Sequence, residues 1–193
     1  MTQLSDIQIV KKAIDGDKGA FNELMNRYEK PILNFAYRLL SSRTEAEDVT
    51  QEVFLRAYKN IEKFEFRAKF STWLFKIARN LCLNKLRHTF RFPTFSINKP
   101  LKGSERDFQM QIEDKKQVSP SSNLLKKEMQ DTVRNALGSL PKTQKIAVIL
   151  RRYEDMSYEE ISEIMGCSVS AVKSLLNRAK QALKNKLSYY VQK

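Results

Sequence analysis

Apolar residues recur every three or four positions from Leu4 to about Arg91, the spacing of one face of an α-helix. Breaks in the pattern occur at Gly16, at Pro31 and at 41–44, where the sequence is Ser-Ser-Arg-Thr. The first half of the chain is therefore predicted to be a set of helices joined by short turns.

Two helix starts can be placed within this segment. Thr44 and Glu47 have the spacing of a capping box, in which each side chain bonds the other residue's backbone amide, and they predict a helix that runs to about Ile61. Ser71 is the candidate cap of the next helix, which is predicted over 72–88.

The helical pattern is lost over 92–123, where prolines, a glycine, serines and mixed charges are typical of a flexible linker. It resumes at Leu124 and continues to about Tyr190. Glycine and proline are few, five each, and strong helix formers are abundant. We therefore predict an all-α protein of two small helical domains, 1–91 and 124–193, joined by the linker.

The C-terminal domain has the pattern of a helix-turn-helix. Ser157 and Glu160 have capping-box spacing before a short apolar stripe that ends at Gly166, and a longer basic helix begins at Ser168. In such a motif the second helix inserts polar residues into a DNA major groove. The side chains expected to meet base edges or phosphates are Ser170, Lys173, Ser174, Asn177, Arg178 and Lys180. A plain helical hairpin with a lysine-rich surface is the alternative.

The charge of the chain also points to a polyanionic partner. The net charge is +13 and the isoelectric point is near 9.7. No acidic residue occurs between Glu65 and Glu105, and none follows Glu163. Each predicted domain thus ends in a basic segment, which favours two separate contacts with DNA.

One stripe departs from this basic character. Asp48, Gln51, Glu52 and Leu55 fall at positions i, i+3, i+4 and i+7 of a predicted helix. An acidic patch is poorly suited to DNA and better suited to a basic protein surface, so we interpret it as a protein-docking stripe. A merely solvated helix face would have the same composition.

Aromatic rings and cations alternate in the segment that follows. Unpaired bases stack on aromatic rings while neighbouring cations hold the backbone, so this mixture favours single-stranded DNA or a flipped base. Some rings are expected to lie in the core, together with the apolar stripe of the helix. The candidate contacts are Phe64, Phe66, Arg67, Lys69, Phe70 and Trp73, followed along the helix by Lys76, Arg79, Asn80, Leu83 and Arg87.

Other classes of protein find little support. No apolar run approaches the roughly 18 residues of a membrane span, and the N-terminus lacks a signal-peptide pattern, so we expect a cytoplasmic protein without membrane insertion. Cys82, Cys167 and His88 are too few for a disulfide framework or a zinc site, and buried thiols are expected. No acid pair, activated nucleophile or phosphate loop predicts an enzyme, and no catalytic residue, metal or cofactor is expected.

Taken together, these motifs resemble the extracytoplasmic-function (ECF) sigma factors, the compact group of the sigma-70 family. The resemblance rests on 48–58 (DVTQEVFLRAY), on 70–80 (FSTWLFKIARN), and on Leu140-Pro141 with 158–161 (YEEI). It covers both predicted domains and implies a factor that directs core RNA polymerase to promoters.

The resemblance also implies partners for each surface. The docking stripe would grip the clamp helices of the largest polymerase subunit, and the C-terminal domain would meet the flap of the second-largest. The loop 64–70 would capture a flipped base of the minus-ten element, the second helix of the helix-turn-helix would face the minus-thirty-five element, and the linker would thread toward the active-site cleft. An anti-sigma factor would inhibit the protein. Many relatives carry a glycine near the position of Phe66.

Two other functions fit parts of the sequence. An ordinary helix-turn-helix regulator would bind duplex sites without polymerase, often as a symmetric dimer. An RNA-binding adaptor would use the same aromatic and basic residues on single strands. The acidic docking stripe favours the sigma factor over both.

Overall fold

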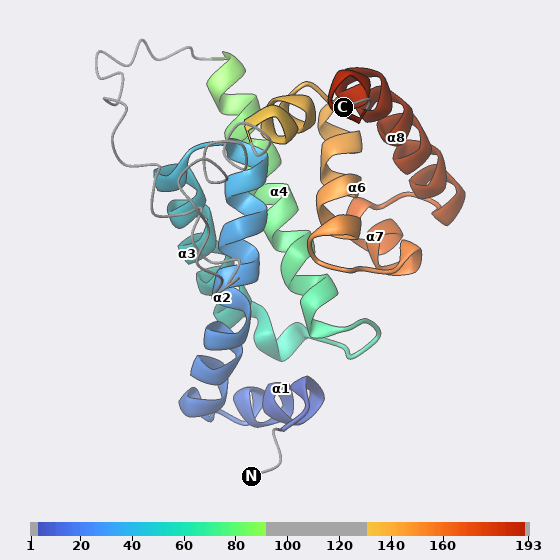
Figure 1. Cartoon of the computed structure of the whole chain (residues 1–193). Coiled ribbons are helices and arrows are strands. Elements are labelled where there is room, and N and C mark those ends of the chain that lie inside the picture. The colour runs from blue at the N-terminus through green and yellow to red at the C-terminus, as the bar shows by residue number, and fades with distance from the viewer. Residues whose placement is uncertain (1–3, 92–130, 192–193) are drawn as a thin grey trace, which may run out of the picture.

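The computed structural model describes residues 4–91 and 131–191 (Figure 1), which form two helical segments, and no strand occurs within these two ranges. The all-α prediction with two helical domains is confirmed. The predicted linker, 92–123, and the predicted start of the second domain at Leu124 lie outside the described residues.

The N-terminal domain is built from four α-helices and one turn of 3₁₀-helix. They are α1 (Asp6–Ile14), α2 (Lys18–Leu40), α3 (Arg43–Asn60), η1 (Ile61–Lys63) and α4 (Phe70–Arg91). Helix α2 lies at the centre, packed against α1, α3 and α4. The core of the domain contains fully buried large side chains from three helices, among them Leu24, Phe35 and Phe75. The rings of Phe35 and Phe75 meet edge to face with their centroids 5.4 Å apart.

Two predicted helix starts were wrong by two residues. Ser42, not Thr44, caps α3, because its side chain accepts a hydrogen bond from the Glu45 amide at 3.3 Å. Helix α4 begins at Phe70, ahead of the predicted start, where packing of the buried Phe70 ring outweighs the capping preference of Ser71. Pro31 does not end α2. It costs the helix one amide hydrogen bond, which the surrounding core offsets.

The C-terminal domain contains a helix over 131–138 and then α6 (Lys142–Arg152), α7 (Tyr158–Met165) and α8 (Val169–Val191). The predicted capping box of α7 is confirmed, with Ser157 as the cap and Glu160 bonding back to its amide at 2.7 Å. Gly166 ends α7 at φ +65°, a left-handed conformation that glycine adopts without strain. Helices α7 and α8 thus form the predicted helix-turn-helix.

The two domains pack against each other. Helix α7 lies along α4, and α6 approaches α2, so buried residues of both domains form a continuous core. Cys82 belongs to this core, and its burial raises the pKa of the thiol to about 12. Cys167 was expected to be buried as well, but it is half-buried because it lies in the turn between α7 and α8.

Candidate nucleic-acid and polymerase interfaces

The docking stripe lies on the surface of α3. Asp48, Gln51 and Leu55 are exposed and Glu52 is half-buried, whereas the neighbouring stripe of Val49, Val53 and Ala57 faces the core. Within the stripe, Asp48 pairs with Lys85 of α4 at 3.1 Å and Glu52 pairs with Arg56 at 2.6 Å. Both ion pairs are solvent-exposed and therefore weak, so a partner's cations can replace these lysine and arginine side chains.

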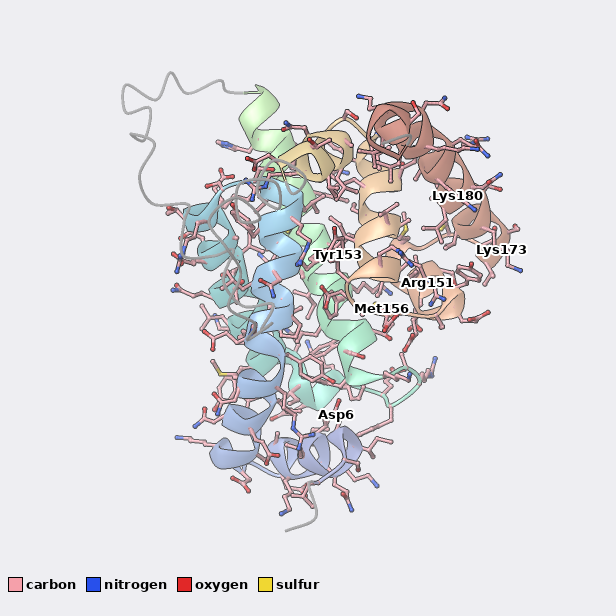
Figure 2. The ribbon with its side chains drawn as sticks, in the orientation of Figure 1. Asp6, Arg151, Tyr153, Met156, Lys173 and Lys180 are labelled. Atoms are coloured by element: carbon pink, nitrogen blue, oxygen red, sulfur yellow. The ribbon has the colours of Figure 1, made fainter. Side chains whose placement is uncertain are left out.

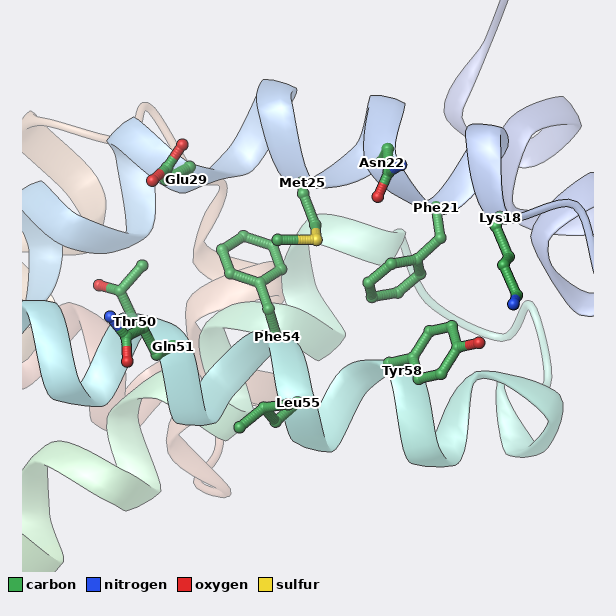
Figure 3. A pocket seen from close by; sticks show the side chains of 10 residues that line it. All are labelled: Lys18, Phe21, Asn22, Met25, Glu29, Thr50, Gln51, Phe54, Leu55 and Tyr58. Atoms are coloured by element: carbon green, nitrogen blue, oxygen red, sulfur yellow. The ribbon is translucent and has the colours of Figure 1, made fainter.

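A pocket of about 580 Å³ opens beside this stripe, between α2 and α3 (Figure 3). Gln51 and Leu55 of the stripe line it, and Leu55 is 55% exposed although it is apolar. The α2 side of this surface was not predicted from the sequence, because no local pattern indicates which helix lies beside α3. The full lining is Lys18, Phe21, Asn22, Met25, Glu29, Thr50, Gln51, Phe54, Leu55 and Tyr58.

The rings around the loop 64–70 form one cluster with an inner and an outer part. Phe64 and Phe70 are buried, and Trp73 is half-buried against both, with ring centroids 5.4 and 5.7 Å away. Phe66 is 39% exposed and packs edge to face on Phe64 at 5.0 Å. Phe66 is thus the ring of the loop that is open to a ligand, and the other three support it.

Phe66 also has an unusual backbone. Its φ is +55°, in the left-handed region that glycine adopts freely and other residues adopt at a cost of about 1–2 kcal/mol. A glycine at this position would be free of that cost. The left-handed backbone conformation therefore disfavours phenylalanine at position 66, and it does not explain why an aromatic ring stands there.

A basic ridge runs along α4 from this loop. Lys76, Asn80 and Arg87 are exposed, and Arg79 and Leu83 are half-buried. The stripe predicted to be buried, Leu74, Ile77, Ala78 and Leu81, does lie in or against the core. At the start of the ridge, Arg67 pairs with Glu65 at 2.9 Å and Lys69 pairs with Glu160 of α7, also at 2.9 Å.

The second helix of the helix-turn-helix presents one polar face. All six predicted contacts on α8 are exposed, whereas Val172 and Ala179 are buried on the opposite side. Figure 2 shows Lys173 and Lys180 projecting outward from α8, away from the N-terminal domain. Ser168 accepts a hydrogen bond from the Ala171 amide at 3.2 Å and so caps the start of this helix. The face can enter a major groove with its N-terminal end first.

Neither a membrane span nor a metal cluster occurs in the part of the chain that the structure describes. Its helices are too short or too polar to cross a membrane, and no group of three or more His, Cys, Asp or Glu side chains there could hold a metal ion.

Comparison with known proteins decides the family. The model of sigma-70 region 2 matches 24–91, and that of sigma-70 region 4 matches 130–183. The ECF RNA polymerase sigma-E factor of Haemophilus influenzae is 35% identical over 96% of each chain. The chain belongs to the ECF sigma factors of the sigma-70 family. As an ECF sigma factor it directs RNA polymerase to promoters, and its relatives are transcription factors rather than enzymes.

Further relatives and solved structures agree with this assignment. The ECF RNA polymerase sigma factor SigW of Bacillus subtilis is 32% identical over 92% of this chain and 94% of its own. The sigma factor RpoE of Bartonella quintana, solved with the anti-sigma factor NepR, is 26% identical, has a TM-score of 0.65 and covers 87% of this chain and 96% of its own. CnrH, solved with the cytosolic domain of CnrY, shares the fold with a TM-score of 0.68 at 24% identity, over 95% of this chain and 97% of its own.

Proposed function

We propose that this sigma factor uses three separate surfaces: the docking stripe on α3 for core polymerase, the loop 64–70 with the α4 ridge for unpaired minus-ten bases, and α8 for the minus-thirty-five duplex. The observation that carries the proposal is the separation of charge. On a chain with a net charge of +13, the docking stripe is acidic and exposed, whereas α4 and α8 present basic faces. A protein partner and DNA can therefore bind at the same time.

The polymerase surface combines charge with an apolar anchor. Asp48 and Glu52 would meet basic side chains of the clamp helices in the largest subunit, and Gln51 would donate or accept hydrogen bonds at the centre. Leu55 and the pocket between α2 and α3 would bury an apolar side chain from the same helices. Exposed charges set the rate and orientation of binding, while the buried apolar contact supplies most of the affinity.

The minus-ten surface captures a base by stacking. Phe66 offers the exposed ring, held in place by Phe64, while Lys69 and Lys76 are positioned for the backbone of the single strand. Stacking on an aromatic ring is worth about 1–3 kcal/mol per base, comparable to the few kcal/mol needed to unstack it. Binding energy from this loop would thus offset strand separation without any chemical step by the protein.

The minus-thirty-five surface reads duplex DNA through α8. Ser170, Lys173, Ser174 and Asn177 lie nearest the N-terminal end and would approach base edges, with Arg178 and Lys180 closer to phosphates. The domain that carries α8 would also contact the flap of the second-largest polymerase subunit. We place the domain limits at 1–91 and 124–193, with 92–123 as the linker.

An inhibitory partner is part of the proposal. Bartonella quintana RpoE was solved with an anti-sigma factor, and it resembles this chain in both sequence and fold. We expect an anti-sigma factor for this protein too. We expect the sigma factor itself to act in the cytoplasm.

The test is run-off transcription on a library of promoter fragments, with core polymerase and the full chain. Specific transcripts are expected with the intact protein and not with core alone. Asp48→Ala/Glu52→Ala should lose transcription and core binding together, whereas Asp15→Ala/Glu62→Ala, which removes two exposed acids elsewhere in the domain, should keep both. A protein that footprints duplex alone and never directs core polymerase would be a conventional regulator, and the proposal would be refuted.

The minus-ten role has a separate test. Trp73→Ala should leave core binding unchanged and slow promoter opening, because Trp73 supports the ring cluster without touching the docking stripe. Opening can be followed by permanganate reactivity of unpaired thymines. An unchanged opening rate would contradict a role for this cluster.

A further inference from the structure

Polar side chains tie the first helix of the chain to the second. Asp6 is the first residue of α1, and both of its carboxylate oxygens are bonded to α2: one accepts a hydrogen bond from the Arg27 guanidinium at 2.8 Å, and the other accepts one from the Tyr28 hydroxyl. Figure 2 shows Asp6 on the side of α1 that faces the rest of the domain. Hydrogen bonds to a carboxylate are stronger than those between neutral groups, so Asp6 holds both side chains in place.

Tyr28 stands where three helices meet. Its side chain is half-buried, its ring packs against the Phe70 ring of α4 with the centroids 5.7 Å apart, and the side chain of Ser71 interacts with its hydroxyl. Burial raises the pKa of the Tyr28 phenol, as does the neighbouring Asp6 carboxylate, so the hydroxyl keeps its proton and donates a hydrogen bond to Asp6. Tyr28 therefore connects α1, through its hydroxyl, to the beginning of α4, through its ring.

The contacts continue from Tyr28 to the exposed ring of the loop 64–70. Phe70 packs edge to face on Phe64 with the centroids 5.8 Å apart, and Phe64 packs in the same way on Phe66 at 5.0 Å. Side chains in a close-packed core do not move independently, because the gap that one leaves costs contacts with its neighbours. A shift of the Tyr28 ring is therefore passed through Phe70 and Phe64 to Phe66.

Attachment of α1 to the domain does not require the Tyr28 hydroxyl. Ile9 of α1 is fully buried, and Arg27 bonds both the Asp6 carboxylate and the Leu4 carbonyl, each at 2.8 Å. These contacts hold α1 on α2 without Tyr28. The bond from Tyr28 to Asp6 has a second consequence, because it fixes the orientation of the Tyr28 ring.

We propose that Tyr28 is a positioning residue for base capture at the minus-ten element: held by Asp6, its ring supports the aromatic cluster whose exposed member is Phe66. The inference rests on the proposed function, because it takes Phe66 to be the ring on which the unpaired base stacks. Stacking depends on how the two planes are offset, so a displaced Phe66 ring would bind the base less tightly. The proposal gives a role in promoter opening to α1, which precedes the segment 24–91 matched by the model of sigma-70 region 2.

The decisive variant is Tyr28→Phe, which keeps the ring and removes only the hydroxyl that Asp6 holds. Asp6→Ala removes the other partner of this bond from a different helix. Tyr37→Phe is the matched control, because it also removes a phenol hydroxyl from α2, and its position about two and a half turns further along places it on the opposite side of that helix. Urea unfolding measures how far each substitution destabilises the protein.

The measurement is the rate of promoter opening, followed by permanganate reactivity with core polymerase, the full chain and a promoter selected from the run-off library. Tyr28→Phe and Asp6→Ala should slow opening by at least about threefold, because part of the stacking on Phe66 is lost, and Tyr37→Phe should not slow it. Core binding should be unchanged in the first two variants, because neither Tyr28 nor Asp6 belongs to the docking stripe or lines the pocket beside it.

A merely structural role can be separated by combining the substitution with Phe66→Ala. That substitution removes the ring that Tyr28 positions, so Tyr28→Phe should slow opening by less than about 1.5-fold in the Phe66→Ala background. Two substitutions that act independently would instead multiply, and Tyr28→Phe would again slow opening by about threefold.

The possible failures have different meanings. If Phe66→Ala slows opening but Tyr28→Phe does not, or slows it equally with and without the Phe66 ring, the positioning role is refuted and the proposed function stands. The same conclusion follows if Tyr37→Phe slows opening as much as Tyr28→Phe. If Phe66→Ala itself leaves opening unchanged, base capture by this loop is refuted, and the positioning role with it.

Discussion

The capping box of α7 is expected to govern the stability of the helix-turn-helix. Ser157→Ala would remove the hydrogen bond that the serine side chain accepts from the Glu160 amide at 3.1 Å. The reciprocal bond, from the Ser157 amide to the Glu160 carboxylate at 2.7 Å, uses the backbone and survives the substitution. One of the two capping bonds is therefore lost.

The magnitude follows from that loss. Replacing a serine N-cap with alanine costs about 1 kcal/mol, within a range of about 0.5–2. Because half of the box remains, we expect a value near the middle of this range and not at its upper end. For a domain of this size, about 1 kcal/mol lowers the melting temperature by roughly 4–8 °C.

The assay is urea unfolding followed by far-ultraviolet circular dichroism, with amide hydrogen exchange to locate the effect. A loss of about 1 kcal/mol should accelerate amide hydrogen exchange in α7 by about fivefold, since about 1.4 kcal/mol corresponds to a factor of ten. Ser162→Ala is the control, because this serine lies inside the same helix and its hydroxyl donates to the Glu159 carbonyl in place of capping an amide. Equal effects of the two substitutions, or a Ser157→Ala effect below about 0.3 kcal/mol, would refute the argument.

Three further predictions concern the sites. Phe66→Gly should stabilise the N-terminal domain by up to about 1 kcal/mol in thermal unfolding, because glycine adopts φ +55° without strain, and it should slow promoter opening. A loss of stability would show that the packing of the ring contributes more than the backbone strain costs. Lys173→Ala/Arg178→Ala should weaken binding of a minus-thirty-five duplex. The slope of log affinity against log salt, measured by fluorescence anisotropy, should fall by about 1, because Arg178 is the member of this pair that lies closer to phosphate; an unchanged slope would place Arg178 away from phosphate. Burial raises the pKa of Glu154 to about 7, above its ordinary 4.5, so the folded state keeps a proton that the unfolded state loses. The stability from this group should be complete below pH 4.5 and lost as the pH rises through about 7, and Glu154→Gln should remove that part of the pH dependence of urea unfolding; identical profiles would contradict it.

Periodicity alone was enough to predict the exposed faces of single helices. The six polar residues on α8 and the docking stripe on α3 were placed correctly on the surface, because a helical repeat assigns each side chain to a face. The capping box at Ser157 and the turn at Gly166 were also predicted, since both depend on residues within one turn of each other. Interactions between residues this close in the chain can be predicted from the order of the amino acids alone.

Only the tertiary structure decided which surfaces meet. Phe64, Phe66 and Phe70 look alike in the sequence, but long-range packing buries two of the rings and leaves Phe66 exposed. The pocket beside α3 exists because α2 lies next to it, and Lys145 is buried because its amine reaches a carbonyl of the other domain. Contacts between residues distant in the chain depend on how whole helices pack, which no local pattern specifies.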